Sequence, residues 1–257
     1  MIEKIVDSQT KIKFIMPYCL YPYGNYLKYG LDKENFSIYK CNKIFFSVYN
    51  KSLHVFQKLI SFKTAEEIAT FALQNKVADI RGSTFAIKRI KKYIQNSKIE
   101  FGYALKLFNN KHDISLDKMT ILEAKEEERF NEIADLVCDV NLKHNSNFFS
   151  KEEYFKQIYE RYLNGYTRNY YLKVNDEIIA SCSTYAETPE YAVLGGLVVK
   201  GEYQKQHLGS KLFLYTVNKV IEDNKNAWLF CFNSSILGYY FKFTDKKYKY
   251  CRLYIKY

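Results

Sequence analysis

The stretch of sequence that decides the fold runs from Gly195 to Leu212 and reads GGLVVKGEYQKQHLGSKL. An apolar, β-branched run over 193–199 ends at Lys200-Gly201, and a polar loop follows it. Beyond the loop, apolar residues recur at helical spacing from Leu208 to Val220. The pattern predicts a strand, followed by a loop that opens directly into a helix.

The start of that helix predicts an anion-binding site. The first turn of a helix carries backbone N–H groups without intrahelical partners, and the positive end of the helix dipole lies there too. Gly209 would let a phosphate approach the backbone without meeting a side chain. Two other phosphate-binding loops are excluded, because the stretch contains neither G-x-x-x-x-G-K-[S/T] nor G-x-G-x-x-G. The residues therefore predict a site for a phosphate-bearing ligand.

The loop from Gln204 to Gly209 resembles the signature [Arg/Gln]-x-x-Gly-x-[Gly/Ala] of the GNAT acetyltransferase superfamily, which clasps the pyrophosphate of acetyl-coenzyme A (acetyl-CoA). His207 stands where the family has its first Gly. Its ring either contacts a phosphate when protonated or faces solvent while its backbone N–H does the binding. The resemblance implies that the following residues bind acetyl-CoA: Gln204, Lys205, Gln206, His207, Leu208, Gly209 and Ser210. It also implies that backbone N–H groups of the strand residues Leu197, Val198 and Val199 hold the pantetheine arm and polarise the thioester carbonyl.

A second part of the resemblance lies near the C-terminus, where the family often carries Asn-x-x-Ala-x-x-[apolar]-Tyr-x-x-x-Gly-Phe. This chain offers Asn233, Ile236, Tyr239 and Tyr240 at the matching spacings, with Thr244-Asp245 in place of Gly-Phe. Asn233 then belongs to the coenzyme site, and Tyr240 takes the position of the tyrosine that protonates the departing thiolate. Because the chain has 25 tyrosines, the alternative for Tyr240 is packing. Tyr239 is a second candidate for the acid.

The general base that would deprotonate the amine is left open. Some family members carry a Glu on the central strand, but Val193 occupies that position here. Glu187, Glu190 and Tyr185 lie nearby on a predicted hairpin and could act directly or through water. We keep Glu187 and Glu190 as candidates; the alternative for each is a solvated carboxylate.

The predicted elements of the C-terminal half follow the family's order. A strand over 119–122 precedes a helix around 130–137, and Ser150 with Glu153 forms a capping box for a helix over 151–163. A hairpin over 170–185 comes next, and the central strand, loop and helix follow it. The chain closes with a strand over 227–232, a helix over 234–243 and a strand over 249–255. We therefore predict an α/β (α+β) GNAT fold over 117–257, with a central mixed, mostly antiparallel sheet flanked by helices.

Residues 1–116 predict a smaller α/β domain. We expect strands at 12–16 and 44–49, a helix from a capping box at Thr64–Glu67, a strand over 77–80, a helix over 85–94 and a strand over 103–108. This order resembles the reduced, GNAT-like half of two-domain GNAT proteins, and the alternative is an unrelated α/β domain. The coenzyme signature is missing from this part, so we expect it to shape the acceptor pocket without binding coenzyme A.

The composition indicates which classes of partner and which cellular compartment to expect. The net charge is +11, but lysine is spread over the whole chain, and a solvated helix face explains the densest cluster (88–93) better than a nucleic-acid contact. The six cysteines have neither disulfide nor zinc spacing, and the four histidines form no ligand set, so we expect a reducing cytoplasm and no metal. We expect neither a signal peptide nor a membrane partner, because no run approaches about 18 apolar residues.

The resemblance therefore implies an acetyl-CoA-dependent N-acetyltransferase that moves an acetyl group to a primary amine by direct attack. A small-molecule acceptor is favoured over a protein tail. The alternative is a catalytically inert, acyl-CoA-binding sensor or scaffold, which the missing strand carboxylate and His207 favour. A nucleic-acid-associated protein is a third hypothesis. The acceptor, the length of the acyl group and the oligomeric state are left open.

Overall fold

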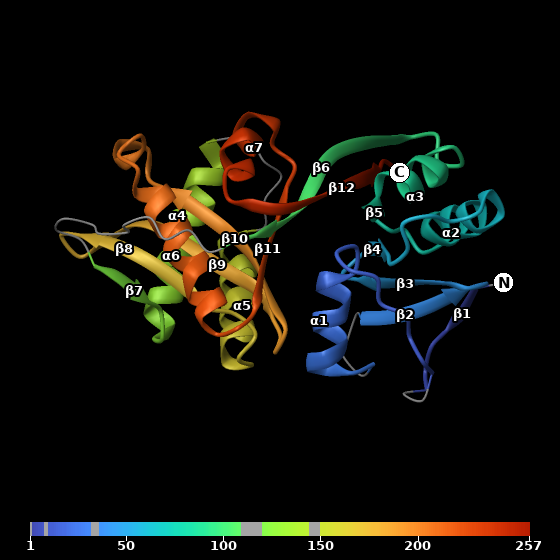
Figure 1. Ribbon diagram of the computed structural model, residues 1–257, viewed down its shortest axis with the longest axis horizontal. Helices are drawn as coiled ribbons and strands as arrows, with labels where there is room; N and C mark the ends of the chain where they lie inside the picture. Colours follow the sequence, from blue (N-terminus) through green and yellow to red (C-terminus); the bar gives the residue numbers. More distant parts are fainter. Residues whose placement is uncertain (1, 8–9, 32–35, 109–119, 144–149) are drawn as a thin grey trace. The chain divides into compact units, whose positions relative to one another are not determined.

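The computed structural model describes residues 2–7, 10–31, 36–108, 120–143 and 150–257 (Figure 1). Its internal contacts divide the chain into two compact units, residues 1–105 with 230–257, and residues 106–229. The predicted boundary between residues 116 and 117 lies outside the described residues and stays a prediction. The division groups the C-terminal segment 230–257 with the N-terminal part of the chain.

The first unit is built on a mixed sheet with the strand order β1-β2-β3-β4-β5-β12-β6. The parallel pair is β4 with β5, whereas β1–β2, β2–β3, β3–β4 and β5–β12 are antiparallel. The strands are β1 (Ile2–Lys4), β2 (Phe36–Cys41), β3 (Ile44–Tyr49), β4 (Ser52–Val55), β5 (Asp79–Ser83), β6 (Ser97–Leu107, with the division after Leu105) and β12 (Thr244–Ile255). The helices are α1 (Leu20–Tyr29), α2 (Phe62–Gln74), α3 (Thr84–Lys91) and α7 (Ser234–Phe241).

The main core of this unit lies between the sheet and the helices α2 and α3, which lie beside one another in Figure 1. Ile68 of α2 and Ile87 of α3 are fully buried against strand residues such as Leu53, Ile80 and Leu253. In β12 the core residues Cys251, Leu253 and Ile255 alternate along the strand, as burial of one sheet face requires. The C-terminal strand β12 therefore contributes to the core that the N-terminal helices cover.

The second unit holds the strand order β11-β10-β9-β8-β7. The pair β10–β11 is parallel, and β7–β8, β8–β9 and β9–β10 are antiparallel. The strands are β7 (Ile121–Glu123), β8 (Asn169–Val174), β9 (Glu177–Glu187), β10 (Tyr191–Val199) and β11 (Asn226–Cys231, with the division after Leu229). The helices are α4 (Glu127–Lys143), α5 (Lys151–Leu163) and α6 (Leu208–Glu222), with a 3₁₀ turn at Gly201–Tyr203.

Helices cover both faces of this second sheet. Tyr171 of β8 packs in the cluster formed with α4 and α5, whereas the ring of its neighbour Tyr170 meets Tyr215 of α6 at a centroid distance of 5.3 Å. Successive residues of a strand point to opposite faces, so α4 and α5 lie on one face and α6 on the other. The predicted α/β fold, with a mixed, mostly antiparallel sheet flanked by helices, is confirmed. Of the described helices, none has both the length and the apolar character needed to span a bilayer.

Of the local predictions for helix starts and strands, one is confirmed and two are wrong. The capping box at Ser150 and Glu153 is confirmed, with both reciprocal hydrogen bonds present. The capping box at Thr64–Glu67 is wrong, because α2 begins earlier, with Ser61 as its N-cap accepting from the Thr64 N–H. The strand predicted at 12–16 is also wrong: Ile12, Phe14 and Met16 pack on a core cluster without joining the sheet. Apolar alternation reports burial, and burial does not require a strand ladder.

Candidate functional site

The loop after β10 leads into α6 through two residues with left-handed backbone. Lys205 has φ 63° and His207, the N-cap of α6, has φ 60° and ψ 6°. A non-glycine residue can adopt this conformation at some cost, and His is among the types enriched in it. His207 thus takes a conformation that a Gly would adopt freely. This accounts for how a chain with His at that position still closes the loop.

The first turn of α6 presents its backbone donors. The first hydrogen bond of the helix runs from the Lys211 N–H to the His207 carbonyl, at 3.0 Å. The His207 side chain makes no capping hydrogen bond to the turn. The N–H groups of Leu208, Gly209 and Ser210 precede that first bond and have no intrahelical partner, as is general at a helix start. This arrangement suits an anion.

A cavity of about 220 Å³ lies at this helix start. It is lined by the strand end, the loop and the first turn of α6: Val199, Tyr203, Gln204, Lys205, His207, Leu208, Gly209 and Ser210. Seven of these residues are predicted coenzyme contacts; Tyr203 was missed by the sequence analysis. The structure therefore brings most of the predicted loop residues around one hollow, at the place where the helix presents its donors.

Two glutamine side chains of the loop are used to hold its backbone. The Gln204 amide donates to the Val199 carbonyl at 3.0 Å, and the Gln206 amide donates to the Glu202 carbonyl at 3.3 Å. Gln204 thereby ties the loop to the end of β10 while it lines the cavity. Gln206 is not among the residues that line it. Both side chains shape the loop in this structure.

Gly209 lies against β10. A Cβ at this position would come within 3.0 Å of the Val199 Cγ2 atom, which is tighter than ordinary van der Waals contact. Gly201, in the same loop region, has open space where its Cβ would be. Of these two glycines, only Gly209 is in a place where a side chain would be crowded. A side chain there would meet Val199, which lines the cavity.

The centre of β10 carries an irregularity at Gly195 and Gly196. The pairing with β9 shifts register between Gly195 and Val198, and Gly196 has φ 62°. A Cβ on Gly195 would lie 2.2 Å from the Tyr185 ring, and a Cβ on Gly196 would lie 2.7 Å from the Tyr185 hydroxyl. The Gly-Gly pair in a strand pattern was the signal for such a bulge, which sequence reasoning did not use.

The bulge coincides with the end of one strand pairing. β10 pairs with β11 from Tyr191↔Asn226 to Leu194↔Leu229. Residues of β10 up to Leu194 are buried, and Gly195, Gly196, Leu197 and Val199 are partly exposed, whereas Val198 packs in the core beneath α4 and α5. The predicted pantetheine-binding residues Leu197–Val199 therefore lie on the partly exposed half of the strand that leads to the loop.

Tyr185, a candidate base, forms a partly buried hydroxyl pair with Tyr154. Its hydroxyl lies 3.0 Å from the Tyr154 hydroxyl, and Arg161 lies over its ring at 5.6 Å from the centroid. Burial, followed by the interaction with Tyr154, raises the pKa of Tyr185 well above its ordinary value. The hydroxyl is therefore neutral at physiological pH, and a proton-abstracting role would require it to ionise.

Glu187, the first carboxylate candidate, is held in an ion-pair network. Its Oε1 accepts from Arg168 at 2.6 Å and from Thr184 at 2.7 Å, and its Oε2 accepts from Lys225 at 2.9 Å. The side chain is 7% exposed. Burial alone would raise the pKa of Glu187, but the hydrogen bonds from Arg168 and Lys225 hold it below its usual value. This geometry favours a structural role, whereas the Glu190 side chain is exposed in the β9–β10 turn.

Asn233 and Tyr240 belong to the first unit, and the loop belongs to the second. Asn233 is the N-cap of α7, and its Oδ1 accepts from the Ser235 N–H at 2.9 Å and the Ser235 hydroxyl at 2.6 Å. Capping alone explains an Asn at that position. Tyr240 is 7% exposed, with its ring 5.3 Å from that of Tyr239. Their roles at the coenzyme stay predictions.

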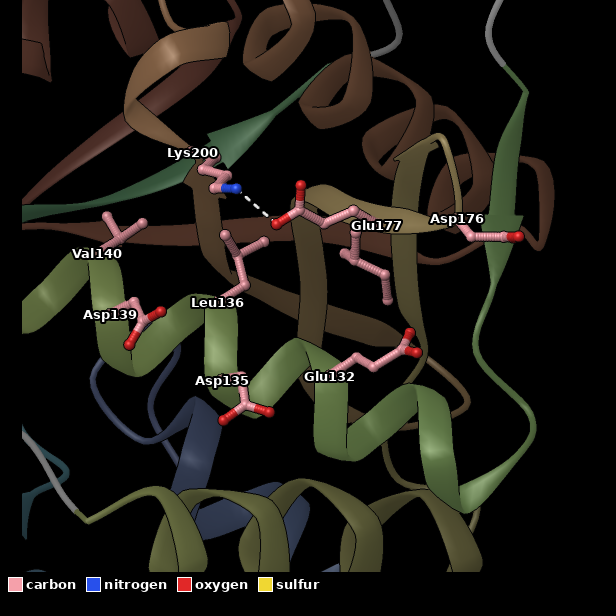
Figure 2. A pocket seen from close by; sticks show the side chains of 9 residues that line it. Glu132, Asp135, Leu136, Asp139, Val140, Asp176, Glu177 and Lys200 are labelled. Carbon is pink, nitrogen blue, oxygen red and sulfur yellow. Dashed lines mark hydrogen bonds and ion pairs between the residues drawn. The ribbon is translucent and has the colours of Figure 1, made fainter.

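A second cavity, of about 300 Å³, lies between α4 and the β8–β9 turn (Figure 2). Five carboxylates line it: Glu132, Asp135, Asp139, Asp176 and Glu177. Four of them pair with a cation among the described residues, although Arg129 and Lys200 are shared with other carboxylates. Glu132 pairs with Arg129, Asp135 with Lys151, Asp176 with Lys173, and Glu177 with Lys200. Because these charges are compensated internally, the cavity does not point to a cationic ligand. Within the described ranges, no cluster of His, Cys, Asp and Glu could hold a metal ion.

Comparisons with known proteins give one family match and several solved structures of similar fold. Residues 132–240 match the model of the acetyltransferase (GNAT) family. No curated protein matches the sequence with significance. Among solved structures, a GCN5-related N-acetyltransferase from Kribbella flavida is similar with a TM-score of 0.60 at 9% identity, over 83% of this chain and 87% of that one.

Two further structures extend the similarity along the chain. An acetyltransferase of the GNAT family from Colwellia psychrerythraea aligns over 100% of both chains, with a TM-score of 0.59 and 10% identity. A tandem GNAT protein from the clavulanic acid biosynthesis pathway aligns over 84% of this chain and 81% of its own, with a TM-score of 0.54 and 12% identity. At these identities the similarity concerns the fold alone. The GNAT family model thus matches residues 132–240, and the similarity of fold to GNAT structures extends along the rest of the chain.

Proposed function

We propose that this protein is an acetyl-CoA-dependent N-acetyltransferase that acts on a primary amine, with a small molecule favoured as the acceptor. The observation that carries the proposal is the cavity at the start of α6, where unpaired backbone donors, a glycine and a lysine converge. A phosphate fits donors of this kind without a side-chain cap. The match to the GNAT family supports the same ligand.

The residues present fit the coenzyme. The pyrophosphate would be held by the N–H groups of Leu208, Gly209 and Ser210, with Lys205 adding positive charge at the cavity wall. Gly209 leaves free the space that a side chain would fill. The pantetheine arm would run along Leu197–Val199, the partly exposed half of β10. Acetyl-CoA supplies an acetyl thioester that an amine can attack directly.

The reaction also needs an acid for the thiolate and a base for the amine. We propose Tyr240 as the acid that protonates the departing thiolate, because a positioned hydroxyl makes the thiolate a better leaving group. Glu190 is the carboxylate candidate for the base, acting through water, since Glu187 is committed to Arg168 and Lys225. We also propose a cytoplasmic setting. The six cysteines are buried free thiols, which is ordinary in a reducing compartment.

The test is release of coenzyme A thiol against a panel of amines, with the purified full-length protein. We expect release that depends on both acetyl-CoA and one class of amine. A diamine or amino-acid amide panel, run beside a lysine-rich peptide, separates small acceptors from protein tails. Binding of acetyl-CoA without release for any acceptor would contradict the transferase and favour a sensor.

A further inference from the structure

The surface around α3 exposes large apolar side chains that the proposed acetyl transfer does not use. Leu59 is 58% exposed, Phe62 50%, Phe85 55% and Phe101 55%. Single exposed apolar residues are common, but a group of them on one surface points to an interaction. Their positions in the chain are the segment before α2, the first turns of α2 and α3, and β6.

Cations lie over the three phenylalanines of this group, and Leu59 is the chain neighbour of one of these cations, Lys58. The Lys58 ammonium lies 6.0 Å from the Phe85 ring centroid, and the Lys88 ammonium lies 5.6 Å from that of Phe101. Over Phe62 lie both Arg89, at 4.7 Å, and Lys92, at 4.9 Å. We call the four apolar residues and these four cations the α3 surface. Because three of the cations stand on α3 or at its C-cap, the helix runs through its middle.

The positive charge of the α3 surface is not compensated within the described chain. None of Lys58, Lys88, Arg89 and Lys92 lies within ion-pair distance of a described carboxylate. Arg89 instead donates to the Ile60 carbonyl, which fixes the segment before α2 against α3. Exposed lysines elsewhere, such as Lys28 and Lys51, likewise have no ion pair with a described carboxylate, so the distinguishing feature here is that the cations lie beside exposed apolar side chains. The α3 surface therefore combines four positive charges with exposed apolar area, which suits a partner that is both anionic and partly apolar.

The opposite face of α3 is packed in the core, so the helix stays in place when a partner binds its exposed face. Ala86, Ile87 and Ile90 are fully buried in the main core of the unit. A partner would therefore meet a preformed surface, with apolar side chains beside long cationic ones. Lysine and arginine can lay their aliphatic stems along apolar surface while the charged end reaches a polar layer. That combination matches the interfacial region of a bilayer, where apolar side chains enter between headgroups and cations meet phosphates.

We propose that the α3 surface docks this protein onto a membrane rich in anionic phospholipid, which replaces the sequence-based expectation of a solvated helix face at 88–93 and of no membrane partner. Single-stranded nucleic acid is the competing anionic partner, but its bases stack on open aromatic faces. Here the protein's own cations lie over the three phenylalanine rings, and Leu59 offers no ring at all. The inference is independent of the proposed acetyl transfer, because none of its residues belongs to the loop or to β10.

The experiment is flotation of the full-length protein with vesicles of phosphatidylcholine, with or without one-third phosphatidylglycerol. We expect binding to the anionic vesicles alone, and weaker binding at high salt because exposed charges are screened. Each removed cation should weaken partitioning roughly fivefold. The double variant Lys88→Gln/Lys92→Gln should thus lose roughly twentyfold or more. Its matched control is Lys28→Gln/Lys51→Gln, which removes two exposed lysines of the same unit outside this surface.

A second pair of variants tests the apolar contribution at constant charge. Leu59→Ser should weaken binding to anionic vesicles, whereas Leu163→Ser, at a position that is 66% exposed in the other unit, should not. All variants are at exposed positions, and melting curves verify that they fold. No binding to anionic vesicles, or equal losses in test and control variants, would overturn the proposal. Binding to a single-stranded oligonucleotide that prevents flotation, and that the same variants abolish, would also overturn it in favour of nucleic acid.

Discussion

At the scale of the single residue, His207 tests whether the loop works through its backbone. Because His207 sits at φ 60°, glycine should replace it without strain, and a β-branched residue should not. We expect His207→Gly to bind acetyl-CoA within a few-fold of the wild type, with a similar melting temperature. His207→Val should lose both stability and affinity. Calorimetry and thermal melting measure the two effects. A tenfold or greater loss in His207→Gly would mean that the imidazole itself contacts the ligand.

Tyr240 makes a prediction about rate at the same scale. If its hydroxyl protonates the leaving thiolate, Tyr240→Phe should lower kcat by roughly 10²–10⁴-fold and leave acetyl-CoA affinity nearly intact. The ring, which is buried in α7, keeps its packing in this variant. Tyr239→Phe is the matched control and should stay near wild-type kcat. A Tyr240→Phe enzyme with a rate within a few-fold of the wild type would assign Tyr240 to packing.

The sequence predicts the position of the loop residues but not the hydrogen-bond partners of their side chains. The letters around Gly209 were enough to locate a cavity at a helix start, because the strand, loop and helix are all local. They could not show that Gln204 and Gln206 bond to the loop's own carbonyls, or that Glu187 pairs with Arg168. Those partners depend on backbone geometry and on strands that are distant in sequence.

At the scale of the element, the Glu187 network joins the end of β9 to the residues just before β8 and β11, Arg168 and Lys225. Glu187→Gln would leave the positive charges of Arg168 and Lys225 without their common carboxylate. Breaking a buried pair of this kind costs about 3 kcal/mol of unfolding free energy. Denaturant unfolding near pH 7 measures it. The control is Glu222→Gln, which removes an exposed partner of Lys219 and should change little.

The same network predicts a pH dependence with a definite sign. The pKa of Glu187 is lower in the folded state than in the unfolded chain, so its stabilisation is present above the unfolded-state value. It is lost as the pH falls through the folded-state value. The stability difference between the wild type and Glu187→Gln should therefore shrink on acidification. A difference that stays constant down to acid unfolding would show that the pKa of Glu187 is the same in the folded and unfolded states, so that the network does not stabilise its ionised form.

Elements were predicted best where hydrogen bonds between residues close in sequence determine where the element begins. Ser150 and Glu153 give the start of α5 because both hydrogen bonds of the box are local. The final strand was placed at 249–255, yet β12 begins at Thr244, since polar residues such as Lys246 and Lys247 continue an exposed part of the ladder. The helix α1 was missed because Pro22 and Gly24 lie within it. Long-range pairing and packing override weak local preference.

At the scale of the whole molecule, the C-terminal strand links the two ends of the sequence. β12 pairs with β5 from Tyr250↔Ser83 to Tyr254↔Asp79, and Cys251, Leu253 and Ile255 lie in the core beneath α2 and α3. A chain truncated to residues 106–257 would expose that face of β12. We expect such a chain to aggregate or to bind a hydrophobic dye, without a cooperative melt. A monomeric 106–257 chain that melts cooperatively would show that the C-terminal half folds alone.

The proposed function of the molecule depends on binding of acetyl-CoA by the loop at the start of α6. The most direct measurement is a calorimetric titration with acetyl-CoA of the wild type, Gly209→Glu and Gly201→Glu. The two variants add the same charge, but only position 209 lines the cavity and has Val199 within 3.0 Å of the added Cβ. We predict saturable binding by the wild type and by Gly201→Glu, and severe loss of binding in Gly209→Glu. Unchanged affinity in Gly209→Glu, or no binding by the wild type, would contradict the account.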